Sequence, residues 1–297
     1  MFVVKYRKIW FALSAILLAF SLFSMVRYGF NTSIDFTGGT LTEISYEGSD
    51  RAKGQIEGVL TRLDIGGYSM RPSGNDRYVV RTHFLTDQES KKFSDSLLGI
   101  SSTKFTIERQ NSIGPVAGAE LKSKAVKAVV VVIIMIVLFI TFAFRRVSKP
   151  VSSWKYGLAT IIALAHDVII PTGIFAFLGH FYGTEIDLLF VTGLLAILGY
   201  SVHDTIVVFD RVRENLTLGK NEPFEETVGK SVQQTFGRSI NTSLTIFITL
   251  LALYIFGPST TKEFALLLTI GVVIGTYSSI FVASPLLVTF QKWQKKG

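Results

Sequence analysis

The chain has 297 residues, of which 48% are hydrophobic and only 18% are charged, and its mean hydropathy is +0.43. This composition is too apolar for an ordinary soluble domain and indicates a polytopic membrane protein. The net charge of +8 does not predict nucleic-acid binding, because the basic residues lie beside apolar runs, where membrane topology places them. The absence of cysteine excludes disulfides, thiol catalysis and thiolate metal sites.

Six apolar runs are long enough to cross a bilayer, which requires about 17–25 residues for a helix. They cover residues 9–26, 125–144, 156–178, 186–209, 240–256 and 264–290. The first run follows basic residues, as a secretory signal does, but no small-x-small cleavage site comes after it. We therefore expect an uncleaved first helix.

The basic residues beside these runs predict the orientation of the chain. They lie in the N-terminal tail, in the loops after helices 2 and 4 and in the C-terminal tail: Lys5, Arg7, Lys8, Arg145, Arg146, Lys149, Lys155, Arg211, Arg213, Lys220, Lys230, Arg238, Lys292, Lys295 and Lys296. The loops on the other side, 179–185 and 257–263, contain only Lys262. This asymmetry predicts that both termini are cytoplasmic in a cell (inner) membrane. The expected organisation is a tail and first helix in 1–26, an extracytoplasmic domain in 27–124, and helices 2–6 in 125–297.

The domain between helices 1 and 2 has a mixed pattern of strands and helices. Strands are predicted at 40–47, 67–71, 77–84 and 103–110, and a turn sequence fills 72–76. A helical stripe covers 51–63, with Asp50 as its cap, and the capping box Thr86-x-x-Glu89 opens a second helix. The order βαββαβ is that of a ferredoxin-like fold.

Asp204 stands beside His203 inside the fourth apolar run. A charged carboxylate in hydrocarbon is costly, so such a residue normally faces a protein interior or a wet cavity and marks a functional site. Burial favours its protonated form and a nearby cation favours its ionised form, so a balance of the two permits proton exchange. The alternative is a carboxylate whose hydrogen bonds only hold helices together.

Arg238 is the natural partner for Asp204, because it begins the fifth helix and polar residues such as Ser239 and Ser243 follow it into the membrane. The alternative is an arginine that anchors the helix end at the lipid headgroups. Spacing alone does not choose between the two.

The third apolar run also contains a histidine next to an aspartate, His166 and Asp167, four residues before Pro171. Two such pairs on consecutive helices predict a shared polar seam. The alternative is that His166 and Asp167 satisfy each other and a backbone kinked by proline.

The sixth run carries the small residues Gly271 and Gly275, followed by Ser278 and Ser279. This spacing is typical of a helix-packing face, here against helix 5 or a partner subunit. The sequence has no Walker motif and no GxGxxG, so any driving force must come from a gradient or a partner. We expect no catalytic residues, no cofactor and no metal site.

Several of these segments together resemble the SecF family, the small subunits of SecD–SecF protein-export complexes. They are Asp35–Gly39 after helix 1, Ala165–Asp167 in helix 3, and Gly199–Ser201 with Asp204–Arg211 in helix 4. The resemblance covers nearly the whole chain. It implies a polytopic α-helical membrane protein of the RND superfamily, with six transmembrane helices (an RND half-type arrangement) and the ferredoxin-like domain after helix 1.

The resemblance also implies a function and partners. The chain would be a non-enzymatic subunit of the Sec protein translocase that, with SecD, couples a proton or sodium gradient to preprotein export. SecYEG, YajC, preproteins and membrane lipid are the other implied partners. The ion-coupling pair falls on Asp204 and Arg238; His203 departs from the asparagine of the family pattern, and a titratable imidazole there could tune the coupling.

Asp35, Phe36, Gly38 and Gly39 allow two interpretations. Paired glycines permit backbone conformations closed to other residues. The segment is either a hinge that couples the domain to helix 1 or a tight turn that leads into the strand at 40–47.

Two other functions agree with the same pattern. One is half of an RND-type small-molecule exporter, although such pumps usually carry two repeats and two large loops. The other is a scaffold that stabilises the translocon without transport, for which the charge of Asp204 would be unimportant.

Overall fold

The computed structural model describes residues 2–48, 51–74, 76–144, 152–218 and 222–294. Several residues named above lie outside these ranges: Asp50, Arg145, Arg146, Lys149, Lys220, Lys295, Lys296 and position 75 of the predicted turn. The chain divides into two compact units, one formed by Thr32–Val126 and the other by Met1–Asn31 with Lys127–Gly297. We describe each unit by itself.

The smaller unit has the predicted βαββαβ order. Its elements are a short helix α3 (Ile34–Thr37), β1 (Gly39–Glu47), α4 (Ala52–Arg62), β2 (Ser69–Pro72), β3 (Arg77–Thr82), α5 (Asp87–Leu98) and β4 (Lys104–Ile113). The four strands form one antiparallel sheet in the order β2-β3-β1-β4. This is the ferredoxin-like arrangement that the sequence predicted.

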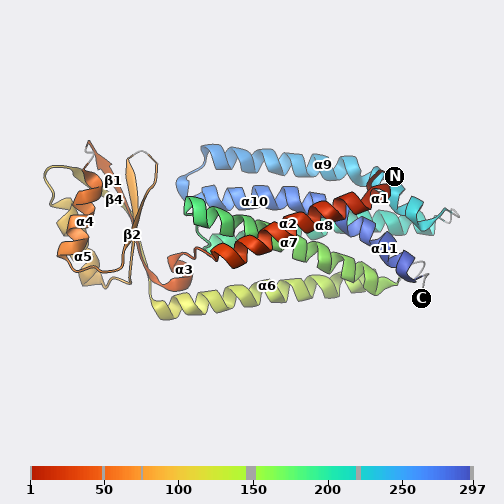
Figure 1. Ribbon diagram of the computed structural model, residues 1–297, viewed down its shortest axis with the longest axis horizontal. Helices are drawn as coiled ribbons and strands as arrows, with labels where there is room; N and C mark the ends of the chain where they lie inside the picture. The colour runs from red at the N-terminus through yellow and green to blue at the C-terminus, as the bar shows by residue number, and fades with distance from the viewer. Residues whose placement is uncertain (1, 49–50, 75, 145–151, 219–221, 295–297) are drawn as a thin grey trace. The chain divides into compact units, whose positions relative to one another are not determined.

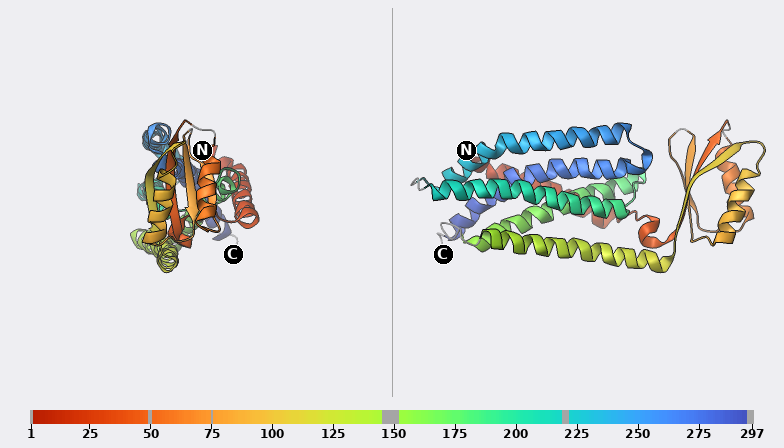
Figure 2. Two further views of the ribbon diagram at one scale, coloured as in Figure 1. Left: turned by 90° about the vertical axis from the view of Figure 1, so that its left-hand side faces the viewer. Right: turned by 180° about the vertical axis from the view of Figure 1, so that it is seen from behind.

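The core of this unit lies between the sheet and its two helices, α4 and α5, which cover the same face (Figure 2). Ile44 of β1 is buried with Ile56 and Leu60 of α4 and with Phe93 and Leu97 of α5. Burying side chains of this size contributes about 1.5–3 kcal/mol each. The alternation of β1 and the helical stripes of α4 and α5 therefore bring their apolar sides together.

The larger unit contains the membrane-spanning helices, drawn in Figure 1. They are α2 (Arg7–Tyr28), α6 (Pro115–Ala143, which begins in the smaller unit), α7 (Ser153–Tyr182), α8 (Leu188–Thr217), α9 (Phe224–Phe256) and α10 (Ser259–Ser278), which continues through a π-helical turn, η1 (Ser279–Ala283), into α11 (Ser284–Gln294). A short helix, α1 (Phe2–Lys5), precedes α2. Six helices in the described residues are long and apolar enough to span a membrane, which confirms the predicted number.

The helices extend further than the apolar runs that predicted them. α6 begins at Pro115 rather than at 125, so helix 2 starts inside the range assigned to the domain. α8 continues to Thr217 and α9 already begins at Phe224. Hydropathy detects only the apolar part of a helix, whereas polar turns also form helix, as in α6, where Lys124 pairs with Glu120 at 2.8 Å.

α8 packs against three other helices, α7, α9 and α10. An aromatic cluster fixes one end of it. Phe144 stacks on Tyr156 of α7 at 5.4 Å between ring centroids, and Tyr156 meets Phe209 of α8 edge-on at 5.3 Å. Interlocked rings of this kind hold α8 in one rotational setting, which decides which of its side chains face the interior.

α6 and α9 lie at the outside of the unit and present apolar side chains outward. Examples are Ile134 and Leu138 of α6 and Leu244 and Ile248 of α9, all of them exposed. Such exposed apolar faces are expected where a helix contacts lipid or another membrane chain.

Candidate functional site

Asp204 is buried among three helices, with 8% of its surface exposed. Its Oδ1 accepts a hydrogen bond of 2.5 Å from the hydroxyl of Ser239 in α9, and its Oδ2 accepts one from the hydroxyl of Ser279 in η1. A buried carboxylate is costly unless its oxygens are hydrogen-bonded. The two serines supply these hydrogen bonds from two different helices.

The structure does not bring Arg238 or His203 to Asp204. Both side chains are exposed, and neither has an ion pair or hydrogen bond within the described part of the chain. Adjacent residues of a helix point about 100° apart. Because Ser239 and Asp204 face each other, their neighbours Arg238 and His203 point outward. The expected pairing of Asp204 with Arg238 is therefore absent from this conformation.

A second set of hydroxyls continues the contact between α8, α9 and α10. Ser243, one turn after Ser239, donates to the carbonyl of Ser239 at 2.7 Å. Its hydroxyl also lies 2.5 Å from that of Thr276 in α10 and 2.6 Å from that of Tyr200 in α8. The interior side of α9 is thus polar along about two turns next to Asp204.

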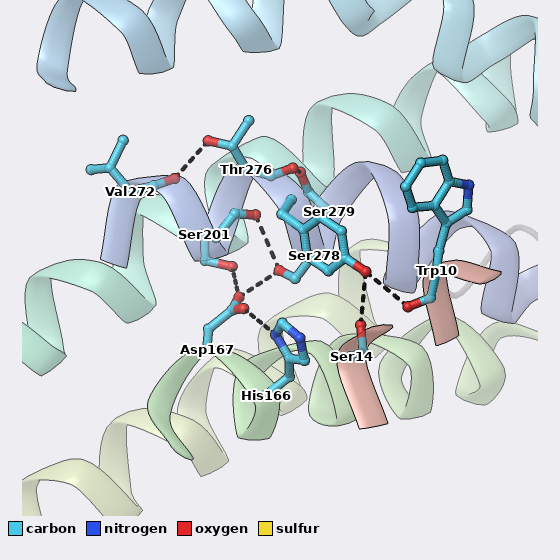
Figure 3. Close-up of polar contacts among 11 residues, drawn as sticks. Trp10, Ser14, His166, Asp167, Ser201, Val272, Thr276, Ser278 and Ser279 are labelled. Carbon is cyan, nitrogen blue, oxygen red and sulfur yellow. Dashed lines mark hydrogen bonds and ion pairs between the residues drawn. The ribbon is translucent and has the colours of Figure 1, made fainter. Parts of the chain in front are cut away.

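His166 and Asp167 form a second buried acidic site, on α7 (Figure 3). Nδ1 of His166 lies 2.9 Å from Oδ1 of Asp167. Oδ2 of Asp167 accepts hydrogen bonds from the hydroxyls of Ser201 in α8 and, at 2.7 Å, of Ser278 in α10. The carboxylate of Asp167 thus joins three helices, whereas His203, the histidine of the other pair in the predicted seam, is exposed.

Tyr277 extends this second site to α2. Its ring lies over that of His166, with 5.9 Å between the centroids and an interplanar angle of 22°. Its hydroxyl donates to the carbonyl of Trp10 at 2.8 Å and lies 3.1 Å from the hydroxyl of Ser14 (Figure 3). Tyr277 therefore hydrogen-bonds α10 to α2, and its ring packs on His166 of α7.

The residues that connect the two acidic sites are neighbours in sequence. Ser278 donates to Asp167 and Ser279 donates to Asp204, at the point where α10 passes into η1. The hydroxyl of Ser284 donates to the carbonyl of Ser279 at 2.8 Å. Pro285 has no N–H for the carbonyl of the preceding turn, and π-helical turns of this kind are frequent at functional sites.

Gly271 and Gly275 face α8. A Cβ at Gly271 would collide with the side chain of Ile197, and a Cβ at Gly275 would lie 3.2 Å from the Cβ of Ser201. We had expected this face to pack on helix 5 or on a partner subunit, and the structure places it on helix 4 instead. The close approach of α10 to α8 lets Ser278 and Ser201 reach the same carboxylate.

The segment from Asp35 to Gly39 forms α3 and the turn that leads into β1. Phe36 is buried, and the hydroxyl of Ser33 caps the helix at the N–H of Asp35. Gly38 and Gly39 have φ values of 72° and 129°, which favour glycine. A Cβ on Gly38 would lie 2.8 Å from the Cα of Pro115, where α6 begins. The geometry is that of a tight, closely packed turn.

Sequence reasoning did not identify the serines that hydrogen-bond the two buried carboxylates. Ser278 and Ser279 belonged to a predicted packing face, Ser239 was named only as a polar residue after Arg238, and Ser201 only as part of a family motif. A signal was present, because small polar residues in spanning helices often hydrogen-bond across helix contacts. Among the described residues no group of three or more His, Asp or Glu side chains is placed to hold a metal ion. The arrangement suits proton exchange at carboxyl groups.

Comparison with known proteins identifies relatives over nearly the full length. A family model described as "Protein export membrane protein SecD/SecF, C-terminal" matches residues 92–293. A protein of Thermobaculum terrenum named "Protein translocase subunit SecF" is 40% identical over 308 residues, which cover 99% of this chain and 94% of that protein. The SecF of Anaerolinea thermophila is 36% identical, with 98% and 96% covered.

Longer relatives contain a region similar to this chain as one part of their length. The "Protein translocase subunit SecDF" of Thermus thermophilus is 34% identical over 90% of this chain and 35% of its own length. The crystal structure of a Thermus SecDF, titled a translocon-associated membrane protein, matches with a TM-score of 0.83 and 34% identity, over 98% of this chain and 38% of that chain. A structure of SecDF in a super-membrane-facing form matches with a TM-score of 0.68 and 33% identity, over 100% of this chain and 39% of that one. The fold, the family model and the full-length relatives agree, and the chain belongs to the SecD/SecF family of protein-export membrane proteins, in its SecF branch.

Proposed function

We propose that the chain is a subunit of a protein translocase that works with a SecD-type chain and couples an ion gradient to the export of preproteins. Its relatives named SecF, and those in which a SecD part is fused to the same fold, support this assignment. The observation that carries it is the burial of Asp204 in a membrane-spanning helix between hydroxyls of α9 and η1. The proposed activity is transport coupling, without enzymatic chemistry.

Protonation of Asp204 changes the hydrogen bonds that Ser239 and Ser279 can make with it. The ionised group only accepts hydrogen bonds, whereas the protonated group must also donate one. One of the two serine hydroxyls then has to turn away, so the contact of α8 with either α9 or η1 is rearranged. The membrane potential contributes about 2.3 kcal/mol per charge per 100 mV. A full switch between two states needs about 5.5 kcal/mol, so one proton biases the equilibrium without completing the switch.

Arg238 would reach Asp204 if α9 rotated about its axis. A rotation by about 100°, the angle between adjacent residues, would replace Ser239 by Arg238 at the carboxylate. α9 contacts α10 directly, and a groove of about 270 Å³ lies beside this contact, between α9, α10 and η1. Apolar side chains such as Leu244, Phe247 and Val273 line the groove. We propose that Asp204 alternates between the serine-bound state seen here and an arginine-bound state.

The partners and the orientation are part of the same proposal. The SecD-type chain supplies the matching six-helix half, and SecYEG, YajC and preproteins complete the assembly at the cell membrane. Both termini are cytoplasmic, and the ferredoxin-like domain acts on the opposite side, where a preprotein emerges. The turn at Gly38 and Gly39 is then where movement of the helices reaches this domain.

The test compares two Asp→Asn substitutions six residues apart on α8. Asp204→Asn removes the buried charge, whereas Asp210→Asn changes an exposed carboxylate that pairs with Arg213 at 2.7 Å on the helix surface. We expect Asp204→Asn to abolish the part of preprotein export into membrane vesicles that depends on the gradient, and Asp210→Asn to leave it intact. Selective collapse of the proton or the sodium gradient identifies the coupling ion.

Normal gradient-dependent export by a well-expressed Asp204→Asn chain would contradict the proposal and favour a scaffold. Substrate efflux by the isolated chain would instead indicate a small-molecule exporter. Copurification with the SecD-type chain checks that each variant still assembles.

A further inference from the structure

We propose that His166 and Asp167 form a second proton-binding site, distinct from Asp204, and that Ser278 and Ser279 link the two sites energetically. The site itself stands on the geometry of α7, α8 and α10. Only its use in export rests on the proposed function.

The first step is the burial of the pair. Asp167 is 0% exposed and His166 is 2% exposed. Every oxygen of the Asp167 carboxylate has a partner, but Nε2 of His166 is buried without a hydrogen-bond partner among the described residues. An unpartnered imidazole nitrogen next to a carboxylate is unusual in a purely structural pair, because buried polar atoms are normally satisfied.

The His166–Asp167 pair offers few free ligand atoms to a metal ion. Both carboxylate oxygens already accept hydrogen bonds, and no metal-binding cluster is found in the described residues. A proton needs no further ligands: it binds to the carboxylate oxygen or to the imidazole, and it is taken from water and returned to water. The pair therefore suits a proton better than a metal ion.

The surroundings of the pair contain few other charges. The elements packed on α7 are α2, α8, α10, η1 and α11. Within the membrane, the other titratable groups that they and α7 itself contribute are Tyr156, Tyr200, Asp204, Tyr277 and the outward-facing His203. Those nearer the helix ends are Arg7, Lys8, Arg27, Tyr28, Lys155, His180, Tyr182, Asp210, Arg211, Arg213, Glu214, Lys262, Glu263 and Lys292. Asp204 is the other carboxyl group that these elements place within the membrane, and adjacent serines bond the two carboxylates, so we expect their charges to influence each other.

The two sites are linked by Ser278 and Ser279, because each of these serines has two possible hydrogen-bond acceptors. The hydroxyl of Ser278 can donate to Asp167 or to the carbonyl of Gly275, which lies 3.1 Å away. The hydroxyl of Ser279 can donate to Asp204 or to the carbonyl of Thr276, at 3.0 Å. A hydroxyl has one hydrogen. When one carboxyl is protonated, its serine can turn back to its own helix.

The two serines are adjacent in the chain, so both hydroxyls depend on the same backbone segment. Ser278 is the last residue of α10 and Ser279 is the first of the π-helical turn. A shift of this turn moves both hydroxyls together, and π-helical turns have an altered hydrogen-bond register that makes such a shift possible. Proton binding at Asp167 therefore changes how well Ser279 supports the charge of Asp204, and the reverse holds by linkage.

The experiment is infrared spectroscopy of the full chain in lipid vesicles, which follows the carbonyl band of protonated carboxyl groups between about pH 5 and about pH 9. We expect two titrating bands, one lost in Asp167→Asn and the other in Asp204→Asn. The midpoint of the Asp167 band should move by about one pH unit in Asp204→Asn. Ser24→Ala is the matched control and should change neither band, since Ser24 is a buried serine that has no hydrogen-bond partner within the part of the chain that the structure describes.

A further variant keeps both carboxyl groups, in case Asp167→Asn does not fold. Ser278→Ala should shift the frequency of the Asp167 band and remove the response of its midpoint to Asp204→Asn. The absence of an Asp167 band that changes with pH would overturn the site, and an unchanged Asp167 midpoint in Asp204→Asn would overturn the link. Neither result depends on export, so failure here is distinct from failure of the proposed function.

Discussion

Asp204 and Asp167 each accept hydrogen bonds from two serine hydroxyls of neighbouring helices. Hydroxyls both donate and accept, so they can serve a carboxyl group in its ionised and in its protonated form. A fixed arginine would favour the ionised form alone. At the scale of single residues, serine is thus a suitable partner for the change of protonation state that we propose for these acids.

In the ferredoxin-like domain, the hydroxyl of Thr86 likewise donates a hydrogen bond to a carboxylate, that of Glu89, and here the contact caps a helix. The backbone N–H and the hydroxyl of Thr86 both donate hydrogen bonds to the carboxylate of Glu89. The backbone bond, with a smaller effect from the hydroxyl, holds the pKa of Glu89 below its ordinary value near 4.5. The hydroxyl of Thr86 also caps the N–H of Glu89. Thr86→Ala should cost about 1 kcal/mol of helix stability and speed hydrogen exchange in α5 about fivefold. Exchange mass spectrometry of the full chain measures this.

The pH dependence follows from the sign of the Glu89 shift. A lowered pKa in the folded state stabilises it at pH values above the ordinary pKa, and this contribution disappears as the pH falls through the lowered value. The difference in α5 exchange between the native chain and Glu89→Gln should therefore be complete at neutral pH and absent in strong acid. Thr61→Ala is the control, since its hydroxyl bonds only a carbonyl of α4. An equal effect of Thr61→Ala on α5 would contradict the capping role.

At the scale of helices, α8 has two different faces. One holds Asp204 and Ser201 in the interior, and the other exposes Gly199 and His203, which are one turn apart. Gln234 of α9 accepts a hydrogen bond from Arg211, two turns after His203, so the exposed side of α9 with Gln234 and Arg238 adjoins this outer face. Imidazole and guanidinium groups are costly against lipid. We infer that the SecD-type chain covers this face.

Crosslinking tests that inference, because the chain has no cysteine and one introduced thiol is therefore unique. A Cβ at Gly199 meets no atom within 4 Å, so Gly199→Cys should be tolerated. Labelled with a short photoreactive maleimide, it should crosslink to the coexpressed SecD-type chain. Met135→Cys, on the exposed face of α6, should react mainly with lipid. Equal crosslinking from the two positions would show that the outer face of α8 is not a specific interface.

The sequence predicted this architecture well wherever one physical signal dominates. Hydropathy located all six spanning helices, and the alternation of residues such as Ile44 together with the Thr86 capping box predicted the ferredoxin-like domain. It also placed Asp204 in a spanning helix. Rotation about a helix axis was harder to predict: Arg238 was chosen for its charge, yet Ser239, one residue later, makes the contact. The π-helical turn was not predicted, because its only local sign is Pro285.

At the scale of the whole molecule, the positive-inside pattern is reinforced by contacts among helix ends. Glu225, at the start of α9, pairs with Arg7 at the start of α2 at 2.6 Å and with Lys292 of α11. The beginning of α2, the beginning of α9 and the end of α11 thus lie at the same end of the bundle (Figures 1 and 2). Half-exposed ion pairs contribute at most about 1 kcal/mol each, so they fix alignment more than stability.

This alignment predicts which parts of the chain are accessible from each side of the membrane. Thr61→Cys lies on the exposed side of α4 in the ferredoxin-like domain, and Leu218→Cys lies at the end of α8. With the termini in the cytoplasm, a membrane-impermeant maleimide should label Thr61→Cys in intact spheroplasts and Leu218→Cys only after lysis. The opposite result would invert the chain and place the ferredoxin-like domain on the side where preproteins enter. It would then have no access to emerging segments, and the coupling of Asp204 to export would need another route.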